Sequence, residues 1–409
     1  MREMKDSGVK WIGEIPVTWN VYRNKNAFVC SKDLVGGKSS ETQLLSLTTK
    51  GIKLKDINNA EGKLPESFDT YQYVKKDEMV MCLFDLDCSA VFSGLSPYDG
   101  MISPAYKVLT CTDRMEPKYA DYWFQYISHG RKFNHYAKNI RYTLSYEEFS
   151  ALPMLFPDRE EQIRISNYLD AKCSKIDEII EKQHAIIEKL KEYKLSYINE
   201  VTNVNDGIKC HLGFIGQMKN GLNFTDTSEG HKIKFLGVGD FKDNFFVDKE
   251  EMFSTIISAE NVAEDYMLHS GDIVFVRSNG SKELVGRAVM VNGIEYPVTY
   301  SGFCIRFRNI RPDIIDSKFL LYYFRSLDFR KQLEKYSQGS NISNLNQDLL
   351  SSLQFTIPSK DYQKRRLDEM EIKCKEIDNA VIKFEGMNNK LQEYKKSLIY
   401  EVVTGKKEV

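Results

Sequence analysis

The sequence predicts a mixed α+β protein in which two similar α/β domains alternate with two long helices. Three observations support this. The length of 409 residues exceeds what one hydrophobic core usually organises. A helical segment returns 201 positions later, and the segments before its two copies share one order of strand patterns. We therefore expect a pseudo-two-fold repeat: a domain at 1–157, a helix at 158–202, a domain at 203–357 and a helix at 358–409.

The composition is that of a folded protein outside the membrane. Hydrophobic residues make up 42% and aromatic residues 12% of the chain, enough for each domain to bury a core of its own. We find no stretch apolar enough to cross a bilayer, and no apolar signal core follows the charged start of the chain. These features predict a cytoplasmic protein.

The charge is balanced overall but uneven along the chain. The net charge of −1 gives no general attraction to nucleic acid. The segment 131–142, however, contains no acidic residue, whereas 240–265 is rich in Asp and Glu. The balanced total is therefore compatible with a local basic face, or with partners that supply much of the phosphate affinity.

The cysteines do not form a metal motif. They lie far apart, without a Cys-x-x-Cys pair, at Cys30, Cys82, Cys88, Cys111, Cys173, Cys210, Cys304 and Cys374. Such spacing favours reduced core residues. One alternative is a metal held by Cys82, Cys88, His129 and His135, but wide and irregular spacing argues against it. We expect no metal.

Matching strand and helix patterns occur in the same order in both domains. The candidate strands pair 43–47 with 234–238, 79–82 with 273–276, and 105–109 with 303–307. A short aromatic helix follows, at 118–124 in the first domain and 318–324 in the second. Its aromatic side chains are predicted to pack in the core.

The two long helices carry the repeat without a gap. The first copy contains Lys189-Leu190-Lys191-Glu192-Tyr193, and the second Lys390-Leu391-Gln392-Glu393-Tyr394. In each copy, residues that are mostly apolar recur at alternating intervals of four and three residues, which predicts a coiled-coil seam. Ordinary amphipathic core helices are the alternative, but repetition at identical spacing favours the coiled coil. The predicted seam residues are Leu169, Cys173, Ile176, Ile180, Gln183, Ile187 and Leu190, and Met370, Cys374, Ile377, Val381, Phe384, Asn388 and Leu391.

Each seam includes one polar residue. Gln183 aligns with Phe384, and Asn388 aligns with Ile187. The alignment therefore predicts polar positions at different levels of the two helices. A buried polar residue can fix the register of a coiled coil at some cost in stability, and a solvated position is the other interpretation.

Several segments resemble one protein family. The opening Lys5-Asp6-Ser7-Gly8-Val9-Lys10-Trp11-Ile12-Gly13-Glu14-Ile15-Pro16-Val17-Thr18-Trp19 is similar to the start of type I restriction-modification specificity subunits. The segment 160–170, followed by Lys175-Ile176-Asp177, resembles their conserved central helix. The second copy departs from this pattern at 361–363 and 367–370. The resemblance covers essentially the whole chain.

The resemblance implies a non-catalytic DNA-binding subunit. Two target-recognition domains would each read one half of a split double-stranded DNA site, separated by antiparallel helices that act as a ruler. Two methyltransferase subunits would dock on the scaffold and methylate an adenine in each half-site, and motor-nuclease subunits would cut unmodified DNA. S-adenosylmethionine, ATP and Mg²⁺ would then bind to the partner subunits, with no cofactor on this chain.

The candidate DNA-binding residues lie in polar loops, because paired hydrogen bonds to base edges need Arg, Lys, Asn or Gln. A solvated hairpin, or a solvated basic surface, is the alternative for each loop. The absence of nearby acidic residues favours DNA contact for the first-domain loop. The candidates are Arg131, Lys138, Asn139, Arg141 and Tyr142 in the first domain, and Arg277, Ser278, Asn279, Ser281, Lys282, Asn341, Ser343 and Asn344 in the second.

Two other classes of function compete. An adenine methyltransferase would need a Pro-Pro-aromatic motif, and Ser96-Pro97-Tyr98 is only a near match. No phosphate-binding Gly-rich loop with Lys is present, and no carboxylate pattern compels a nuclease. The second competing class is a scaffold that binds only proteins. Salt-sensitive binding to duplex DNA would distinguish this class from the specificity subunit.

Overall fold

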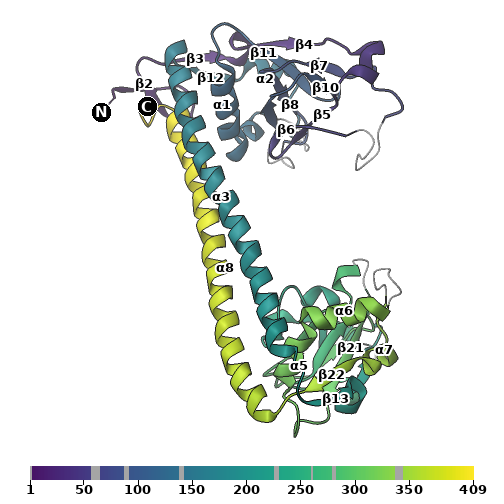
Figure 1. Ribbon diagram of the computed structural model, residues 1–409. Helices are drawn as coiled ribbons and strands as arrows, with labels where there is room; N and C mark the ends of the chain where they lie inside the picture. The colour runs from purple at the N-terminus through teal and green to yellow at the C-terminus, as the bar shows by residue number, and fades with distance from the viewer. Residues whose placement is uncertain are drawn as a thin grey trace. The chain divides into compact units, whose positions relative to one another are not determined.

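The computed structural model describes residues 2–56, 65–86, 92–137, 142–224, 230–258, 261–278, 282–336 and 344–409. It divides into two compact units. Unit 1 comprises 1–183 and 386–409, and unit 2 comprises 184–385. Each unit combines a β-rich region with segments of both long helices, α3 (Arg159–Thr202) and α8 (Lys360–Val403) (Figure 1). The predicted α+β class with two long helices is confirmed.

Equivalent residues start the long helices. Both helices have 44 residues, and their bounds differ by the 201 positions of the repeat. The Asp158 carboxylate accepts a hydrogen bond from the Glu161 amide at 2.7 Å, and the Ser359 hydroxyl accepts one from the Tyr362 amide at 3.3 Å. These side chains satisfy N–H groups that a helix start leaves unpaired.

A buried glutamine braces each helix start in the same way. In unit 1, Gln162 donates to the carbonyls of Pro157 and Arg114 and accepts from the Glu116 amide, at 2.8–3.0 Å. In unit 2, Gln363 donates to Pro358 and Ile314 and accepts from Asp316, at 2.8–2.9 Å. Both side chains are at most 2% exposed. One amide therefore ties three backbone groups together at each site.

The predicted seam is confirmed, since all of its residues are buried or half-buried. In unit 1, Leu169 near the start of α3 shares a core with Val402 near the end of α8. In unit 2, Val201 near the end of α3 shares a cluster with Met370 near the start of α8. Within each unit the helical segments are therefore antiparallel.

Equivalent ion pairs define the register of the seam. Lys395 contacts Asp177 in unit 1, and Lys194 contacts Asp378 in unit 2, each at 2.7 Å. Gln183 follows Asp177 by six residues and Asn388 precedes Lys395 by seven, so the two polar side chains share one layer. The prediction of different levels was wrong, because antiparallel packing matches one helix with the reverse order of the other. Both are buried, and Gln183 Oε1 and the Asn388 amide have no hydrogen-bond partner within the described chain.

Unit 1 is built on an antiparallel sheet of strand order β4-β11-β8-β9, beside the pairs β5-β6, β7-β10, β1-β2 and β3-β12. Helix α1 packs its aromatic face on this sheet, and Phe124 contacts Phe28 of β4 at 5.5 Å between ring centroids. The bounds are β1 Met4–Asp6, β2 Glu14–Pro16, β3 Asn20–Arg23, β4 Phe28–Ser31, β5 Leu45–Thr48, β6 Gly51–Leu54, β7 Gln72–Val74, β8 Met79–Met81, β9 Ser93–Leu95, β10 Gly100–Ile102, β11 Lys107–Cys111, α1 Pro117–His129, α2 Tyr146–Ala151 and β12 Pro153–Phe156.

Unit 2 repeats this order with one strand added, as β14-β21-β18-β19-β16, beside β17-β15-β20 and β13-β22. Phe324 of α5 packs on Phe275 of β18, with ring centroids 4.9 Å apart. The bounds are β13 Ile208–His211, α4 Leu212–Ile215, β14 Gly216–Asn220, β15 His231–Leu236, β16 Phe246–Val247, β17 Ser254–Ser258, β18 Ile273–Val276, β19 Ala288–Val291, β20 Val298–Tyr300, β21 Cys304–Asn309, α5 Ser317–Phe324, α6 Leu327–Tyr336, α7 Gln347–Ser352 and β22 Gln354–Ile357.

Two of the three predicted pairs of strands occupy equivalent places in the two units, whereas the third, 43–47 with 234–238, falls on β5 of the pair β5-β6 and on β15 of the three-stranded sheet β17-β15-β20. β8 lies between β11 and β9, as β18 lies between β21 and β19. The expected match of 79–82 with 273–276 and of 105–109 with 303–307 is therefore confirmed residue by residue. The aromatic helices are confirmed as core elements, because Trp123 and Phe319 are fully buried.

Unit 1 carries an N-terminal arm, residues 2–19, that has no counterpart in unit 2. Trp19 donates its indole N–H to Glu161 at 2.9 Å, and Arg2 pairs with the same carboxylate at 2.6 Å. The hydrogen bond between the Arg2 guanidinium and the Glu161 carboxylate raises the pKa of Arg2. The residue equivalent to Glu161 is Tyr362, whose hydroxyl instead donates to the Val201 carbonyl. The departure of the second copy at Tyr362 thus accompanies the absence of an arm in unit 2.

Candidate nucleic-acid interface

Three loops of unit 2 converge after the central strand β18. The Arg277 and Ser278 amides donate to the Phe303 carbonyl at 2.7 and 3.4 Å. The Leu345 amide donates to the Arg277 carbonyl at 2.8 Å, and Ser278 forms an antiparallel bridge with Asn344. Two loops that the sequence selected separately, around Arg277 and Asn344, are therefore neighbours. We call this site the unit 2 junction.

An exposed aromatic ring belongs to the same junction. Phe303 is 58% exposed although its backbone is held between the other loops. The Arg277 guanidinium, half-buried beside it, donates to the Gly302 carbonyl at 3.3 Å. The junction thus combines a cation, amide and hydroxyl groups and an apolar ring on rigid strand ends, the groups that read base edges and thymine methyls.

The equivalent junction exists in unit 1 with other side chains. The Leu144 amide donates to the Leu83 carbonyl at 2.8 Å, and the Leu86 amide donates to the Tyr142 carbonyl at 3.3 Å. Leu83 stands at the position of Arg277, after the matching strand. Tyr142 and Asp85 have φ of 47° and 50°. Such strained backbone is common at functional sites. The two junctions share a backbone but differ in side chains.

A depression of about 370 Å³ opens at the unit 1 junction. Lys32 and Lys107 supply positive charge to its lining, and Phe84, also in the lining, stacks on Tyr106 with ring centroids 6.0 Å apart. Burial raises the pKa of the Cys30 thiol in the lining, while Lys107 and Lys32 oppose that shift. The thiol is therefore neutral at physiological pH and unsuited to act as a nucleophile. The lining thus combines two cations and an aromatic face with the Glu147 carboxylate.

Short capped helices fix the second loop of each junction. Ser145 caps α2 by accepting from the Glu148 amide at 3.1 Å, and the Glu148 carboxylate accepts from the Ser145 amide at 2.9 Å. Asn346 caps α7 by accepting from the Leu349 amide at 2.7 Å. Because a cap sets the direction in which the chain enters a helix, the loops just before α2 and α7 are held against the strand ends.

The predicted site residues divide into three groups. The structure brings Arg277, Ser278 and Asn344 together and places Tyr142 in the unit 1 junction. Arg131, exposed and with φ of 48°, lies instead in the turn between α1 and the 3₁₀ turn Lys132–His135. Lys138, Asn139, Arg141, Asn279, Ser281, Asn341 and Ser343 lie outside the described residues, as does the side chain of Lys282.

Sequence reasoning missed the aromatic and lysine residues of the junctions. Phe303 was assigned to a strand, although β21 starts only at Cys304. Phe84, Lys32 and Lys107 were not selected. The sequence contained a signal for Phe84. The match of 79–82 with 273–276, continued by two residues, aligns Leu83 with Arg277 and Phe84 with Ser278.

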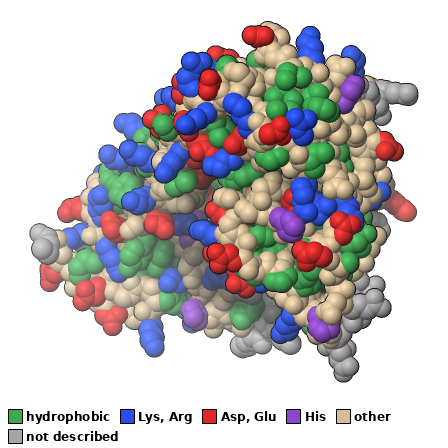
Figure 2. All heavy atoms as spheres, turned by 90° about the horizontal axis from the view of Figure 1, so that it is seen from below, with side chains coloured by type: hydrophobic (Ala, Val, Ile, Leu, Met, Phe, Trp, Pro, Cys, Tyr) green, Lys and Arg blue, Asp and Glu red, His purple; other side chains and the backbone are tan. Residues whose placement is uncertain are grey.

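The described residues show no metal cluster. Within the described ranges, no three His, Cys, Asp or Glu side chains gather to hold an ion, and Cys88 lies outside those ranges. Acidic and basic side chains intersperse over the face in Figure 2, in keeping with the net charge of −1. None of the helices in the described chain is long and apolar enough to span a bilayer.

Comparisons with known proteins agree with this architecture. The sequence model "Type I restriction modification DNA specificity domain" matches residues 210–399. The chain is 25% identical over 146 residues to the EcoKI specificity subunit of Escherichia coli K12, covering 36% of this chain and 31% of the relative. It is 24% identical over 299 residues to the StySPI specificity subunit of Salmonella potsdam, covering 65% and 63%. The chain thus spans less than two thirds of either relative.

Solved structures show the same fold. A chain from a study of complex assembly and conformational transition in a type I R-M system aligns with a TM-score of 0.71 at 13% identity, over 96% of this chain and 99% of that chain. The HsdS subunit from Thermoanaerobacter tengcongensis aligns with a TM-score of 0.51 at 14% identity, over 98% and 99%. Together with the duplicated junctions, the fold defines a class of two-module proteins built on paired helices. The chain is similar to type I restriction-modification specificity subunits, whose DNA specificity domain model matches residues 210–399.

Proposed function

We propose that this chain sets the DNA target of a type I restriction-modification complex and catalyses no reaction itself. The observation that carries the proposal is the occurrence of the same junction of loops twice, on the same backbone but with different side chains. A duplicated frame with different contacts is suited to reading two different half-sites. The related specificity subunits of Escherichia coli and Salmonella support the assignment.

In this proposal residues 1–157 and 203–357 are the two target-recognition domains, and 158–202 and 358–409 are the helices between them. Each domain reads one half-site through its junction, and the first domain also through the turn that contains Arg131. We propose that the DNA-contacting residues are Arg131, Lys138, Asn139, Arg141 and Tyr142 in the first domain, Arg277, Ser278, Asn279, Ser281, Lys282, Asn341, Ser343 and Asn344 in the second, with Phe303 added.

Two methyltransferase subunits and the motor-nuclease subunits are the proposed partners. Exposed apolar residues at heptad spacing support docking on the helices: Ile179, Ile186 and Tyr193 of α3 are 41–49% exposed, and Met387 and Tyr394 repeat the pattern on α8. Apolar residues left in water at this spacing are typical of a face for partner helices. S-adenosylmethionine, ATP and Mg²⁺ would bind to those partners, and the complex would act in the cytoplasm, where its DNA lies.

Adenine-methylation mapping tests the function. Cells that carry the cognate methyltransferase subunit should gain a new methylated motif only when this chain is also present. The expected motif has two short half-sites that flank a fixed gap, because two modules on one scaffold bind at a set separation. Unchanged methylation, despite an active methyltransferase that co-purifies with the chain, would contradict the proposal and favour a scaffold that binds only proteins.

The unit 2 junction should determine one half-site. Phe303→Ala and Asn344→Ala should each weaken binding of the complete complex to its target by about 1–3 kcal/mol, the usual value of one base contact. The loss should disappear when that half-site is changed and persist when the other is changed. The matched control is Phe214→Ala, a ring in unit 2 that is 52% exposed away from the junction. Binding to the DNA target is measured by fluorescence anisotropy. If Phe214→Ala and Phe303→Ala weaken binding equally, the unit 2 junction is not part of the DNA interface.

A further inference from the structure

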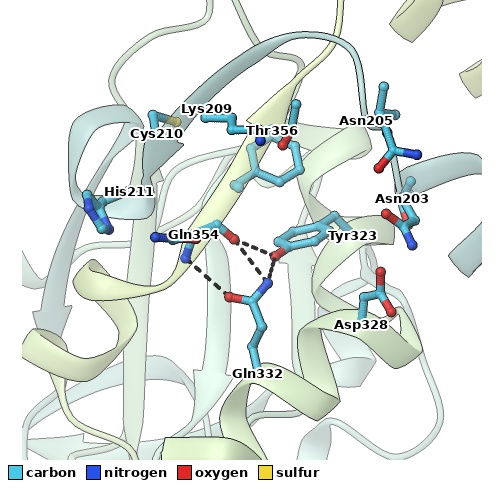
Figure 3. Close-up of a pocket in the computed structure, with 13 residues that line it drawn as sticks. Asn203, Asn205, Lys209, Cys210, His211, Tyr323, Asp328, Gln332, Gln354 and Thr356 are labelled. Atoms are coloured by element: carbon cyan, nitrogen blue, oxygen red, sulfur yellow. Dashed lines mark hydrogen bonds between the residues drawn. The ribbon is translucent and has the colours of Figure 1, made fainter.

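A cavity of about 400 Å³ lies within unit 2, away from the junction. Figure 3 shows it between the end of α3, strands β13 and β22, and the helices α5 and α6. Asn203, Asn205 and Asp328 line one side, near the ring of Tyr323. The Tyr323 hydroxyl is already engaged, donating to the Gln354 carbonyl at 2.9 Å and accepting from Gln332 at 2.8 Å. Tyr323 is only 4% exposed and packs on Phe355, so the small accessible part of its ring and the polar side chains remain as binding groups.

The corresponding place in unit 1 is filled by the protein's own N-terminal arm. Trp11 packs on Trp123 with ring centroids 6.0 Å apart, and Trp123 is the equivalent of Tyr323 on the matching helix. The Ile12 carbonyl accepts from Lys406 at 3.4 Å, and Lys406 is the equivalent of Asn205 by the 201-residue repeat. Two residues that hold the arm in unit 1 thus correspond to two residues that line the cavity in unit 2.

The chain of unit 2 is too short to fill its own cavity. Only residues 203–207 connect α3 to β13, whereas the whole arm precedes the equivalent strand β3. Exposure follows this difference. Thr404 is fully buried under the arm, but its equivalent Asn203 is exposed. Gly405 has φ of +72°, and a Cβ there would lie 2.4 Å from Pro16, whereas its equivalent is Val204. Unit 2 therefore lacks both the arm and the glycine turn that admits it.

We propose that this cavity binds a short peptide turn of another protein chain, which places an aromatic side chain against Tyr323 as Trp11, in the turn closed by the Ile12 amide and the Val9 carbonyl, lies against Trp123. The amides of Asn203 and Asn205 carry both donors and acceptors, so they can pair with peptide N–H and C=O groups. The volume is within the range of small-ligand sites and suits two or three residues. The internal counterpart identifies a peptide as the class of ligand.

The arm sequence provides the probe. A fluorescein-labelled peptide of residues 8–14 is titrated with the full chain and followed by anisotropy. We expect saturable binding with Kd below 1 mM, and at least tenfold weaker binding of the peptide with Trp11→Ala. Thr356→Trp and Asn205→Trp, which fill the cavity from two sides, should each weaken binding at least tenfold. The matched control, Lys331→Trp, places the same ring on an exposed position of α6 and should leave binding unchanged.

Two results would overturn the proposal. One is no saturable binding up to 1 mM. The other is binding that survives both filling substitutions in chains with unchanged thermal unfolding, because the peptide would then be exchanging with the arm of unit 1. Two filling positions are used so that misfolding of one variant leaves the other to decide.

Discussion

Duplication of one heptad in each long helix should lengthen the gap between the two half-sites by about three base pairs and leave the half-sites unchanged. The duplicated segments are 180–186 in α3 and 381–387 in α8, which preserve the seam because it repeats every seven residues. Seven residues add about 10.5 Å of helix at 1.5 Å per residue. One base pair occupies about 3.4 Å of duplex. Methylation mapping of cells that carry the variant gives the new gap directly.

The control is the same duplication in one helix only. It puts Asp177 out of step with Lys395, or Asp378 out of step with Lys194, and should abolish specific methylation. An unchanged gap in a stable double variant would refute the ruler hypothesis while leaving the two half-sites intact. A change in half-site sequence would instead mean that the helices influence base reading.

Gln363→Leu should lower the free energy of unfolding of the chain by about 3–5 kcal/mol. Gln363 is 2% exposed and satisfies the carbonyls of Pro358 and Ile314 and the amide of Asp316. Leucine has a similar size but leaves these buried groups without partners, at about 1–3 kcal/mol each. Urea unfolding of the purified chain measures the loss, and Gln162→Leu should behave alike because its hydrogen bonds are equivalent.

The matched control for this prediction is Gln392→Leu. Gln392 is exposed on α8, so the same chemical change there should alter stability by no more than about 0.5 kcal/mol. A loss below about 1 kcal/mol for Gln363→Leu would mean that water or local rearrangement satisfies the three backbone groups.

Much of the fold could be predicted because its signals are local. The repeat at an offset of 201 residues and the apolar positions spaced alternately four and three residues apart are visible in the sequence alone. They predicted bounds for the long helices that lie close to the observed ones. The matching of 79–82 with 273–276 and of 105–109 with 303–307 succeeded for the same reason. The sequence did not predict that Gln183 and Asn388 lie in the same layer. That layer depends on the register of two antiparallel helices, which neither helix determines by itself.

The candidate site was reached only in part. The residue types suited to base edges pointed to Arg277, Ser278 and Asn344, which do meet. Arg131 was selected for charge alone and lies in another turn. Phe303 was missed because an aromatic residue beside a strand pattern is normally core, and only the fold leaves its ring 58% exposed.

The sequence by itself determined the duplication and the long helices, because periodicity and repeated segments can be recognised without knowledge of contacts. Tertiary structure alone decided which loops meet at each junction. It also decided that the N-terminal arm fills its site in unit 1 while the equivalent site in unit 2 remains a cavity. In unit 1 the arm places Trp11 on Trp123, and Glu161 and Gly405 hold the arm. In unit 2 the equivalent residues are Tyr362, Tyr323 and Val204. Because unit 2 has no arm to pack on them, a cavity remains there. Such differences arise from packing between segments far apart in the chain, which no local pattern records.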